Sequence, residues 1–311
     1  MEKNTRNEYY VTMRNLCNKQ KKINTSLLII HNEPMSCHTS FKTGGPAEFF
    51  ISPSSIKEIR EIIIVYPEAF VIGEGSNLLV SDEGVKGAVI CLELLKNIKE
   101  KNGLIIADAG ASINDVCRFA FERGLSGFEF IYGMPGSVGG AVWMNARCYD
   151  KEIADLLHWV DYMDRSGEIY RYKYDEKDFA YKQSPFQNTD KIIISAAFKV
   201  APGNKIKISE EMDKNYGDRE KKGHFLFPCA GSVFKNNRDF GYPSGKIIEN
   251  CGLKGLSLGD AQVADFHANI IINKGRAKSS EIFKLICEVE RSVLRLTGFK
   301  LAKEIILAGR F

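Results

Sequence analysis

The segment IYGMPGSVGGAVWMNA, residues 131–146, is the stretch that says most about how this chain folds. Four glycines and one proline fall within residues 133–140, a density that is incompatible with a helix interior or a regular strand. We therefore expect a loop whose backbone N–H groups can surround a polyanion such as a pyrophosphate. A long flexible loop is the alternative. The flanking apolar residues favour a buried, fixed loop: Phe130, Ile131, Val142, Trp143 and Met144.

A second glycine-containing turn lies upstream, in VIGEGSNLLV at residues 71–80. A short β-rich run leads into Gly73, Gly75, Ser76 and Asn77, where glycine would allow the backbone to approach a ligand closely. On its own such a pair of glycines is most often only a turn. The spacing also differs from the G-x-G-x-x-G of dinucleotide-binding proteins.

Helix and strand patterns alternate along the rest of the chain. Ser55-x-x-Glu58 predicts the start of one helix, and Ser112 predicts the start of another that ends near Gly124. Residues 157–198 read as strands, and residues 202–231 as helix and loop. A last amphipathic helix is expected to bury Ile282, Ile286, Val289, Val293 and Leu296 and to stop at Gly298, before one short strand within residues 299–311. The pattern predicts a mixed α+β protein.

Composition narrows the class of protein. A chain of 311 residues with 44% hydrophobic and 26% charged residues is expected to form two or three soluble domains. Its net charge of +4 is too small to indicate a nucleic-acid partner. The apolar runs are too short to cross a membrane, and the N-terminus has no signal-peptide core, so a cytoplasmic protein is expected. The eight cysteines include no C-x-x-C pair, which favours reduced, buried thiols and no metal site.

Together with these two segments, several others closely resemble the UDP-N-acetylenolpyruvoylglucosamine reductase family. The resemblance runs in order from about residue 25 to the end. It is carried by HTSFKTGGPAEF (38–49), GEGSNLLV (73–80), the glycine-rich segment, YKQSPF (181–186), AGSVFKN (230–236), SGKIIENCGLKGLSLGDAQVADFHANIIIN (244–273) and LAKEIILAG (301–309). The sequence between YKQSPF and AGSVFKN is uninterrupted. In this respect the chain is similar to the branch of the family that lacks an extra tyrosine-bearing loop.

The resemblance implies a two-subdomain FAD-binding fold of the PCMH/vanillyl-alcohol-oxidase type, followed by a C-terminal α+β substrate-binding lobe. The expected boundaries are a polar extension at 1–24, FAD-binding subdomain 1 at 25–69 and 300–311, subdomain 2 at 70–201, and the substrate-binding domain at 202–299. It further implies a monomer with non-covalent FAD. NADPH would be the hydride donor, and UDP-N-acetylglucosamine enolpyruvate would be reduced to UDP-N-acetylmuramate for peptidoglycan synthesis.

The resemblance also assigns residues. Ser232 matches the proton donor, Glu304 the second catalytic carboxylate, and Lys182 the cation that stabilises the enolate. Substrate contacts are implied for Lys222, Lys235, Asn236 and His267. Cofactor contacts are implied for Gly73, Gly75, Ser76, Asn77, Leu78, Gly133, Pro135, Gly136, Ser137, Gly139, Gly140 and Asn145. His38 lies where the family approaches FAD, but no covalent flavin bond is implied.

Two positions depart from the family pattern. Lys182 stands where the family has arginine, so a point charge replaces a planar fork that can bind a carboxylate through two hydrogen bonds. Arg147 and Cys148 stand where the family usually has glycine and alanine. Two alternatives therefore remain open: another FAD oxidoreductase of the same fold, or a relative that binds FAD or a UDP-sugar without turnover. Retention of Ser232 and Glu304 argues against a relative that has lost its activity.

Overall fold

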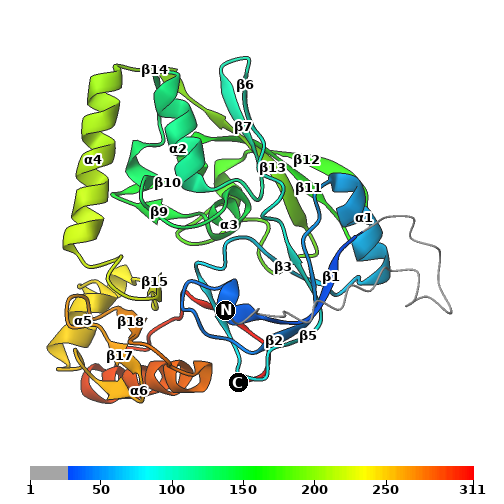
Figure 1. The fold of residues 1–311 in the computed structure, drawn as a ribbon. Coiled ribbons are helices and arrows are strands. Elements are labelled where there is room, and N and C mark those ends of the chain that lie inside the picture. Colours follow the sequence, from blue (N-terminus) through cyan, green and yellow to red (C-terminus); the bar gives the residue numbers. More distant parts are fainter. Residues whose placement is uncertain (1–26) are drawn as a thin grey trace, which may run out of the picture.

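The computed structural model describes residues 27–311, so the expected polar extension at 1–24 lies outside the described residues. The first part of the fold is a four-stranded sheet with the order β1-β2-β5-β3 (Figure 1). Its strands are β1 (Ile29–Pro34), β2 (Pro46–Ile51), β3 (Phe70–Ile72) and β5 (Val85–Cys91). Because β3 and β5 belong to this sheet, the expected boundary between residues 69 and 70 cuts through it. We propose that subdomain 1 extends to about residue 91.

Helix α1 (Ile56–Val65) packs in this region and begins as the sequence predicts. The Ser55 hydroxyl accepts a hydrogen bond from the Glu58 N–H at 3.3 Å. The Glu58 carboxylate accepts from the N–H of Ser54 at 2.6 Å, one residue earlier than a regular capping box would place it. Ile59, Ile62 and Ile63 are fully buried and join the main hydrophobic core.

The second part is a five-stranded sheet with the order β12-β11-β13-β7-β6, which confirms the strands expected within residues 157–198. Its strands are β6 (Ile98–Lys101), β7 (Leu104–Asp108), β11 (Leu157–Met163), β12 (Ile169–Lys173) and β13 (Ile192–Lys199). Helix α2 (Ile113–Glu122) follows β7 and starts after Ser112. Two short antiparallel pairs complete this part: β8 (Leu125–Ser126) with β14 (Ala201–Pro202), and β9 (Arg147–Cys148) with β10 (Lys151–Glu152).

The glycine-rich segment is a loop only as far as Ser137. Helix α3 (Val138–Met144) follows it, so the expectation that residues 133–140 exclude a helix was wrong for residues 138–140. The Ser137 hydroxyl caps this helix by accepting from the Gly140 N–H at 3.3 Å. A Cβ at Gly139 would lie only 3.0 Å from the Cβ of Ala109. Glycine therefore serves close packing at this position rather than a loop conformation.

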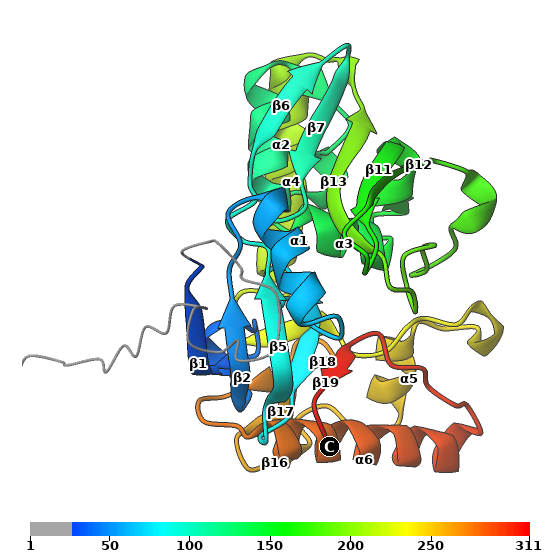
Figure 2. The ribbon, with the colours of Figure 1, turned by 90° about the vertical axis from the view of Figure 1, so that its right-hand side faces the viewer.

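The C-terminal lobe is a smaller sheet, β15-β18-β17-β16, covered by two helices (Figure 2). Its elements are β15 (Cys229–Ser232), α5 (Ser244–Asn250), β16 (Ser257–Leu258), β17 (Ala261–Val263), β18 (Ile270–Asn273) and α6 (Ser279–Thr297). Helix α4 (Lys205–Lys221) leads from the second sheet to this lobe. As expected, α6 ends at Gly298, but Leu296 is 58% exposed. The prediction that Leu296 is buried was therefore wrong, because the core covers only the earlier turns.

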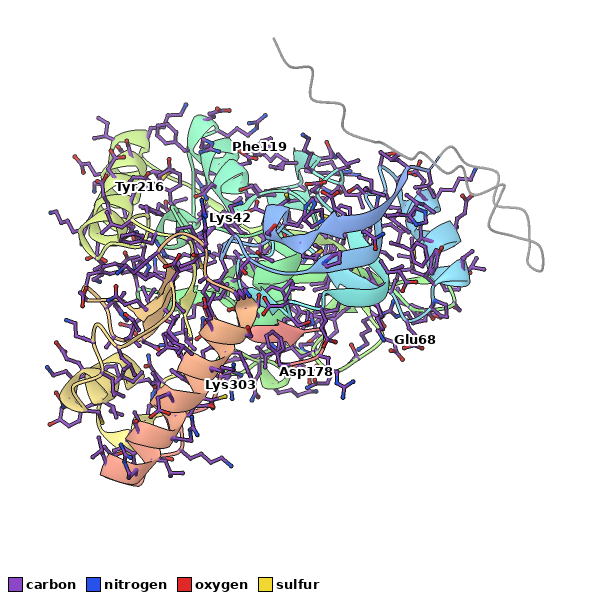
Figure 3. The ribbon with its side chains drawn as sticks, turned by 60° about the horizontal axis from the view of Figure 1, so that its bottom comes forward. Lys42, Glu68, Phe119, Asp178, Tyr216 and Lys303 are labelled. Carbon is purple, nitrogen blue, oxygen red and sulfur yellow. The ribbon has the colours of Figure 1, made fainter. Side chains whose placement is uncertain are left out.

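The end of the chain returns to the N-terminal part of the fold, residues 27–201. Strand β19 (Ile306–Ala308) pairs in parallel with β4 (Leu78–Val80), directly after the GEGSN turn. Short 3₁₀ helices lie at Met35–Cys37, Glu129–Ile131, Ile153–Leu156, Glu176–Asp178 and Arg238–Phe240. Side chains of the C-terminal lobe and of the N-terminal part are shown together in Figure 3, with Lys303 and Lys42 labelled. Within residues 27–311 no helix has the length and apolar character needed to span a bilayer.

Candidate active site

The two glycine-containing turns of the sequence lie against each other in the structure. The Gly136 N–H donates to the Glu74 carboxylate at 2.9 Å. A Cβ at Gly73 would overlap the hydroxyl of Ser137, and a Cβ at Gly75 would overlap the carbonyl of His38. Gly75 also has a φ of +61°, which favours glycine. The Gly73 contact explains why glycine is needed where the two turns meet, and the Gly75 contact explains why it is needed where the first turn passes His38.

This junction has features that suit a pyrophosphate. Within residues 27–311, the N–H groups of Gly75, Ser76 and Asn77 donate to no protein acceptor, although all three residues are half-buried. Successive N–H groups that lack acceptors form a site for anionic oxygens. The turns at residues 73–77 and 133–137 therefore fit the diphosphate of FAD, and they are the residues that would hold it. Pro135 is exposed beside them.

Three residues expected near the cofactor have other partners. Leu78 is buried in the apolar cluster around β4. Asn145 is fully buried, and its amide donates to the Ala180 carbonyl at 3.0 Å and accepts from the Ala154 N–H at 3.3 Å. His38 pairs with Glu33 at 2.9 Å and stacks on Phe50. These contacts favour structural roles, and for Asn145 that role is to hold the turn that carries Lys182.

Lys182 and Glu304 meet at the junction of the N-terminal part and the C-terminal lobe. The Lys182 Nζ lies 2.5 Å from a carboxylate oxygen of Glu304, and the two side chains are only 12% and 11% exposed. Lys182 has a φ of +56°, an uncommon backbone conformation for a lysine that here turns it toward its partner. The Asn77 amide donates to the Glu304 carbonyl at 3.0 Å. The GEGSN turn thus contacts the residue that the sequence marks as catalytic.

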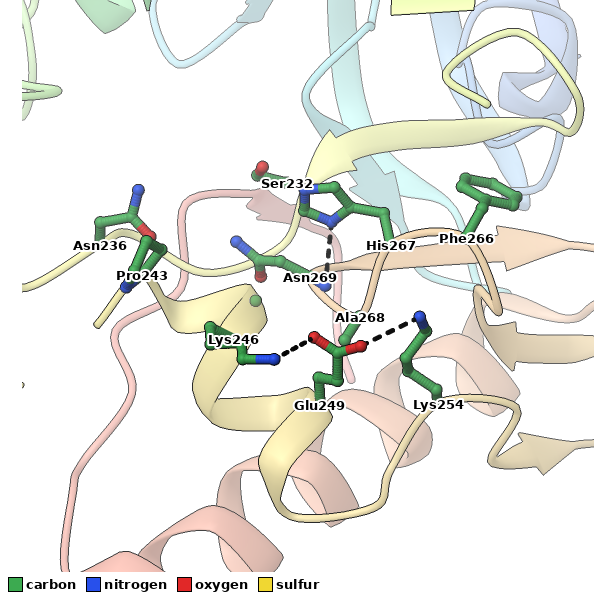
Figure 4. Close-up of a pocket in the computed structure, with 11 residues that line it drawn as sticks. Ser232, Asn236, Pro243, Lys246, Glu249, Lys254, Phe266, His267, Ala268 and Asn269 are labelled. Carbon is green, nitrogen blue, oxygen red and sulfur yellow. Dashed lines mark hydrogen bonds and ion pairs between the residues drawn. The ribbon is translucent and has the colours of Figure 1, made fainter. Parts of the chain in front are cut away.

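Ser232 is the last residue of β15, and its neighbour Val233 contacts the backbone of Glu304. The Glu304 N–H donates to the carbonyl of Val233 at 2.7 Å, which brings the chain on either side of Ser232 next to the C-terminal segment. Ser232 also lines a pocket of about 280 Å³ in the C-terminal lobe (Figure 4). The pocket is otherwise lined by Asn236, Pro243, Gly245, Lys246, Glu249, Lys254, Phe266, His267, Ala268 and Asn269.

The expected phosphate contacts differ in their placement. The Lys235 Nζ lies 3.5 Å from the carbonyl of Lys182, and the Asn236 N–H donates to the Tyr181 hydroxyl at 3.3 Å. Both residues therefore bridge the C-terminal lobe to the Lys182 turn. Lys222, at the end of α4, is tied to Asp218 at 2.7 Å and is not among the residues lining the pocket.

Sequence reasoning missed two residues near this site. Arg219 in α4 is only 9% exposed, and its Nε has no hydrogen-bond partner among the described residues. His224 lies close to His267, with ring centres 6.1 Å apart. Burial lowers the pKa of His224 to about 4, and the nearby positive charge of Arg219 adds to this shift. Burial also lowers the pKa of His267, whose Nδ1 accepts from the Asn269 N–H at 3.2 Å. Both imidazoles are therefore neutral at pH 7.

The shift of His224 predicts a pH dependence of stability. A lowered folded pKa means that the unfolded state binds the proton more tightly, so stability is complete above the unfolded pKa of 6.5 and falls as the pH drops toward 4. At pH 5 the loss would be up to about 2 kcal/mol. We expect urea unfolding at pH 7.5 and pH 5 to show this loss in the wild type and a smaller one in His224→Gln. Equal losses in both proteins would contradict the assignment.

Comparisons with known proteins agree with the fold. The family described as "UDP-N-acetylenolpyruvoylglucosamine reductase, C-terminal domain" matches residues 222–308, and the FAD binding domain family matches residues 47–173. The second match confirms the predicted cofactor and fold class.

Curated relatives extend the similarity to nearly the whole chain. The UDP-N-acetylenolpyruvoylglucosamine reductase of Borreliella burgdorferi is 40% identical, with 93% of this chain and 99% of that protein covered. The reductase of Treponema denticola is 44% identical, over 89% of this chain and 92% of its own. The crystal structure of the reductase from Thermus caldophilus superposes with a TM-score of 0.79 at 30% identity, covering 91% of this chain and all of that one. The chain therefore belongs to the UDP-N-acetylenolpyruvoylglucosamine reductase family.

Proposed function

We propose that this protein reduces UDP-N-acetylglucosamine enolpyruvate to UDP-N-acetylmuramate for peptidoglycan synthesis, and that Lys182, Glu304 and Ser232 carry out the chemistry. The observation that supports these three roles is their convergence. Lys182 and Glu304 form a nearly buried ion pair although they lie 122 positions apart, and Ser232 directly precedes Val233, whose carbonyl accepts from the Glu304 N–H. Bound FAD would supply the hydride that it receives from NADPH.

The residues have complementary tasks in this proposal. Hydride addition to the enolpyruvyl group places negative charge on the substrate carboxylate, so a fixed cation beside it lowers the barrier. Lys182 provides that cation, and Glu304 holds its ammonium in place. The Ser232 hydroxyl then donates its proton to the α-carbon of the substrate. Because the serine develops negative charge as it does so, the Lys182 ammonium also assists the proton donor.

A direct assay tests the proposal. The purified protein is mixed with NADPH and UDP-N-acetylglucosamine enolpyruvate, and the fall in NADPH absorbance is followed together with the appearance of UDP-N-acetylmuramate. Turnover that depends on the enolpyruvyl substrate is expected. Oxidation of NADPH that does not depend on it would favour another flavin oxidoreductase, and the absence of any reaction would favour a relative without turnover.

The cofactor gives a second expected result. The protein should purify yellow, and acid or heat should release the flavin, because the turns at residues 73–77 and 133–137 would hold FAD without a covalent bond. Absorbance and fluorescence of the supernatant after acid precipitation measure this release. A colourless protein that FAD does not reconstitute, or a flavin that stays with the precipitate, would contradict the prediction.

The monomeric state and the cytoplasmic location expected from the sequence stay predictions, as does the preference for NADPH. Size-exclusion chromatography with light scattering tests the first of them. The family acts on a UDP-sugar, and this proposal involves no nucleic acid.

A further inference from the structure

Arg147 occupies an unusual place at the edge of the active site. It is the first residue of β9, and its guanidinium carbon lies 5.6 Å from the centre of the Tyr181 ring. Its side chain is 25% exposed. The only carboxylate that pairs with it among the described residues is that of Asp150, at 3.3 Å across the β9–β10 turn.

The ion pair with Asp150 leaves the guanidinium of Arg147 available to bind a ligand carboxylate. The Asp150 side chain is fully exposed, and exposed ion pairs contribute little because water screens them. A ligand carboxylate in a less exposed position would attract the guanidinium more strongly than Asp150 does. Arg147 can therefore exchange its partner at low cost.

Arg147 lies next to the segment that carries Lys182. Tyr181, under its guanidinium, directly precedes Lys182 and accepts from the Asn236 N–H. Asn145 ties the chain just before β9 to the Ala180 carbonyl. Burial raises the pKa of the Cys148 thiol, and the positive charges of Arg219 and Lys182 oppose that rise. The charge of Lys182 therefore influences the pKa of the residue that follows Arg147.

Among the described residues, the charge balance around Lys182 leaves no free cation for a substrate carboxylate. Lys182 is matched by Glu304, whereas the pocket's Lys246 and Lys254 share the single carboxylate of Glu249 and keep one positive charge between them. A substrate carboxylate entering beside Lys182 would thus meet an ion pair whose net charge is zero. Within residues 27–311, Lys235 also lacks a carboxylate partner, but its ammonium faces the Lys182 carbonyl. Arg147 offers a planar fork that suits a carboxylate.

We propose that Arg147 is a substrate-binding residue that contacts the carboxylate of the enolpyruvyl group and shares it with Lys182. The proposal rests on the proposed function and adds to it a residue that determines specificity for the carboxylated substrate. It predicts that this chain places its carboxylate-binding fork on β9, whereas position 182 supplies only a point charge.

Calorimetric titration of the oxidised holoenzyme tests the proposal without turnover. Two ligands are compared: UDP-N-acetylglucosamine enolpyruvate, and UDP-N-acetylglucosamine, which lacks the carboxylate. Arg147→Gln is expected to weaken binding of the first about 10- to 100-fold, the scale of a lost charged hydrogen bond, and to leave the second unchanged. Arg147→Lys should lie between wild type and Arg147→Gln. Asp150→Asn and the distant Arg291→Gln, which removes a charge from α6, should behave as wild type.

Each outcome of the titration decides one part of the proposal. If Arg147→Gln weakens both ligands equally, the residue binds the part that they share, and the carboxylate assignment is wrong. If neither ligand is affected, Arg147 is no substrate contact and the proposal is also wrong. Flavin content shows whether the variant is folded, and Arg147→Lys repeats the test if Arg147→Gln loses FAD. A wild-type protein that binds both ligands but does not reduce the first would refute the proposed function separately.

Discussion

Ser232→Ala is expected to lower turnover of the enolpyruvyl substrate by roughly 10² or more, the usual scale for the loss of a positioned acid. Reduction of the flavin by NADPH should continue at a nearly normal rate, because that half-reaction requires no proton from Ser232. Stopped-flow absorbance measures the two half-reactions separately. The expected result is therefore a selective loss in the oxidative half.

The surroundings of Ser232 allow the hydroxyl to be removed without a second structural effect. Its side chain forms no hydrogen bond within the described residues, so alanine removes the hydroxyl without leaving a buried partner unsatisfied. Ser244 is a matched control, since its buried hydroxyl donates to the Lys235 carbonyl at 2.6 Å and supports the same segment. Ser244→Ala should affect stability more than the chemical step. Equal slowing of both half-reactions in Ser232→Ala would mean that Ser232 is structural.

What the sequence could predict depended on local patterns. The Ser55 cap, the Gly298 stop and the strands within residues 157–198 are encoded by neighbouring residues, and the structure contains all of them. The GEGSN turn and the glycine-rich segment were expected at one cofactor, and they do lie in contact. Family resemblance, rather than spacing, singled out Lys182, Glu304 and Ser232.

The remaining features depend on contacts between distant segments. Glycine at 139 reads as a loop residue until Ala109 is seen against it. The amide of Asn145 is used by Ala180 and Ala154, which no local pattern reveals. Arg219 looks like one more charged residue of a polar helix, and only the fold shows that it is buried without a carboxylate partner among residues 27–311. Burial also sets the protonation state of His224, so the sequence alone could not predict that its imidazole is neutral at pH 7.

Lys182→Ala is the other variant from which a large effect is expected. If Lys182 stabilises the developing enolate, its loss should lower kcat by about 10²–10³, the scale of one preorganised donor. Flavin reduction by NADPH should be largely spared. The structure adds a second consequence, because alanine would leave the Glu304 carboxylate at 11% exposure without its cation. That carboxylate would repel the substrate carboxylate, so KM should rise as well.

The two consequences can be separated with Glu304→Gln. In the double variant Lys182→Ala/Glu304→Gln the unpaired charge is gone, so KM should recover relative to Lys182→Ala while kcat stays low. Recovery of both constants would mean that Lys182 serves only to neutralise Glu304 and plays no part in the chemical step. Unchanged kcat in Lys182→Ala would move the catalytic charge elsewhere, with Arg147 as the first residue to examine.

Lys182→Arg decides whether the site requires a point charge or a fork. If the space beside Glu304 accepts a guanidinium, the variant should retain substantial activity and could exceed the wild type, because two parallel hydrogen bonds to a carboxylate become available. If Arg147 already provides that fork, the gain should be small in the wild-type background and larger when combined with Arg147→Gln. Loss of activity in both the Ala and the Arg variants would mean that the pocket is built around lysine. Measuring kcat/KM for five proteins distinguishes these outcomes: wild type, Lys182→Ala, Lys182→Arg, Arg147→Gln and the Lys182→Arg/Arg147→Gln pair.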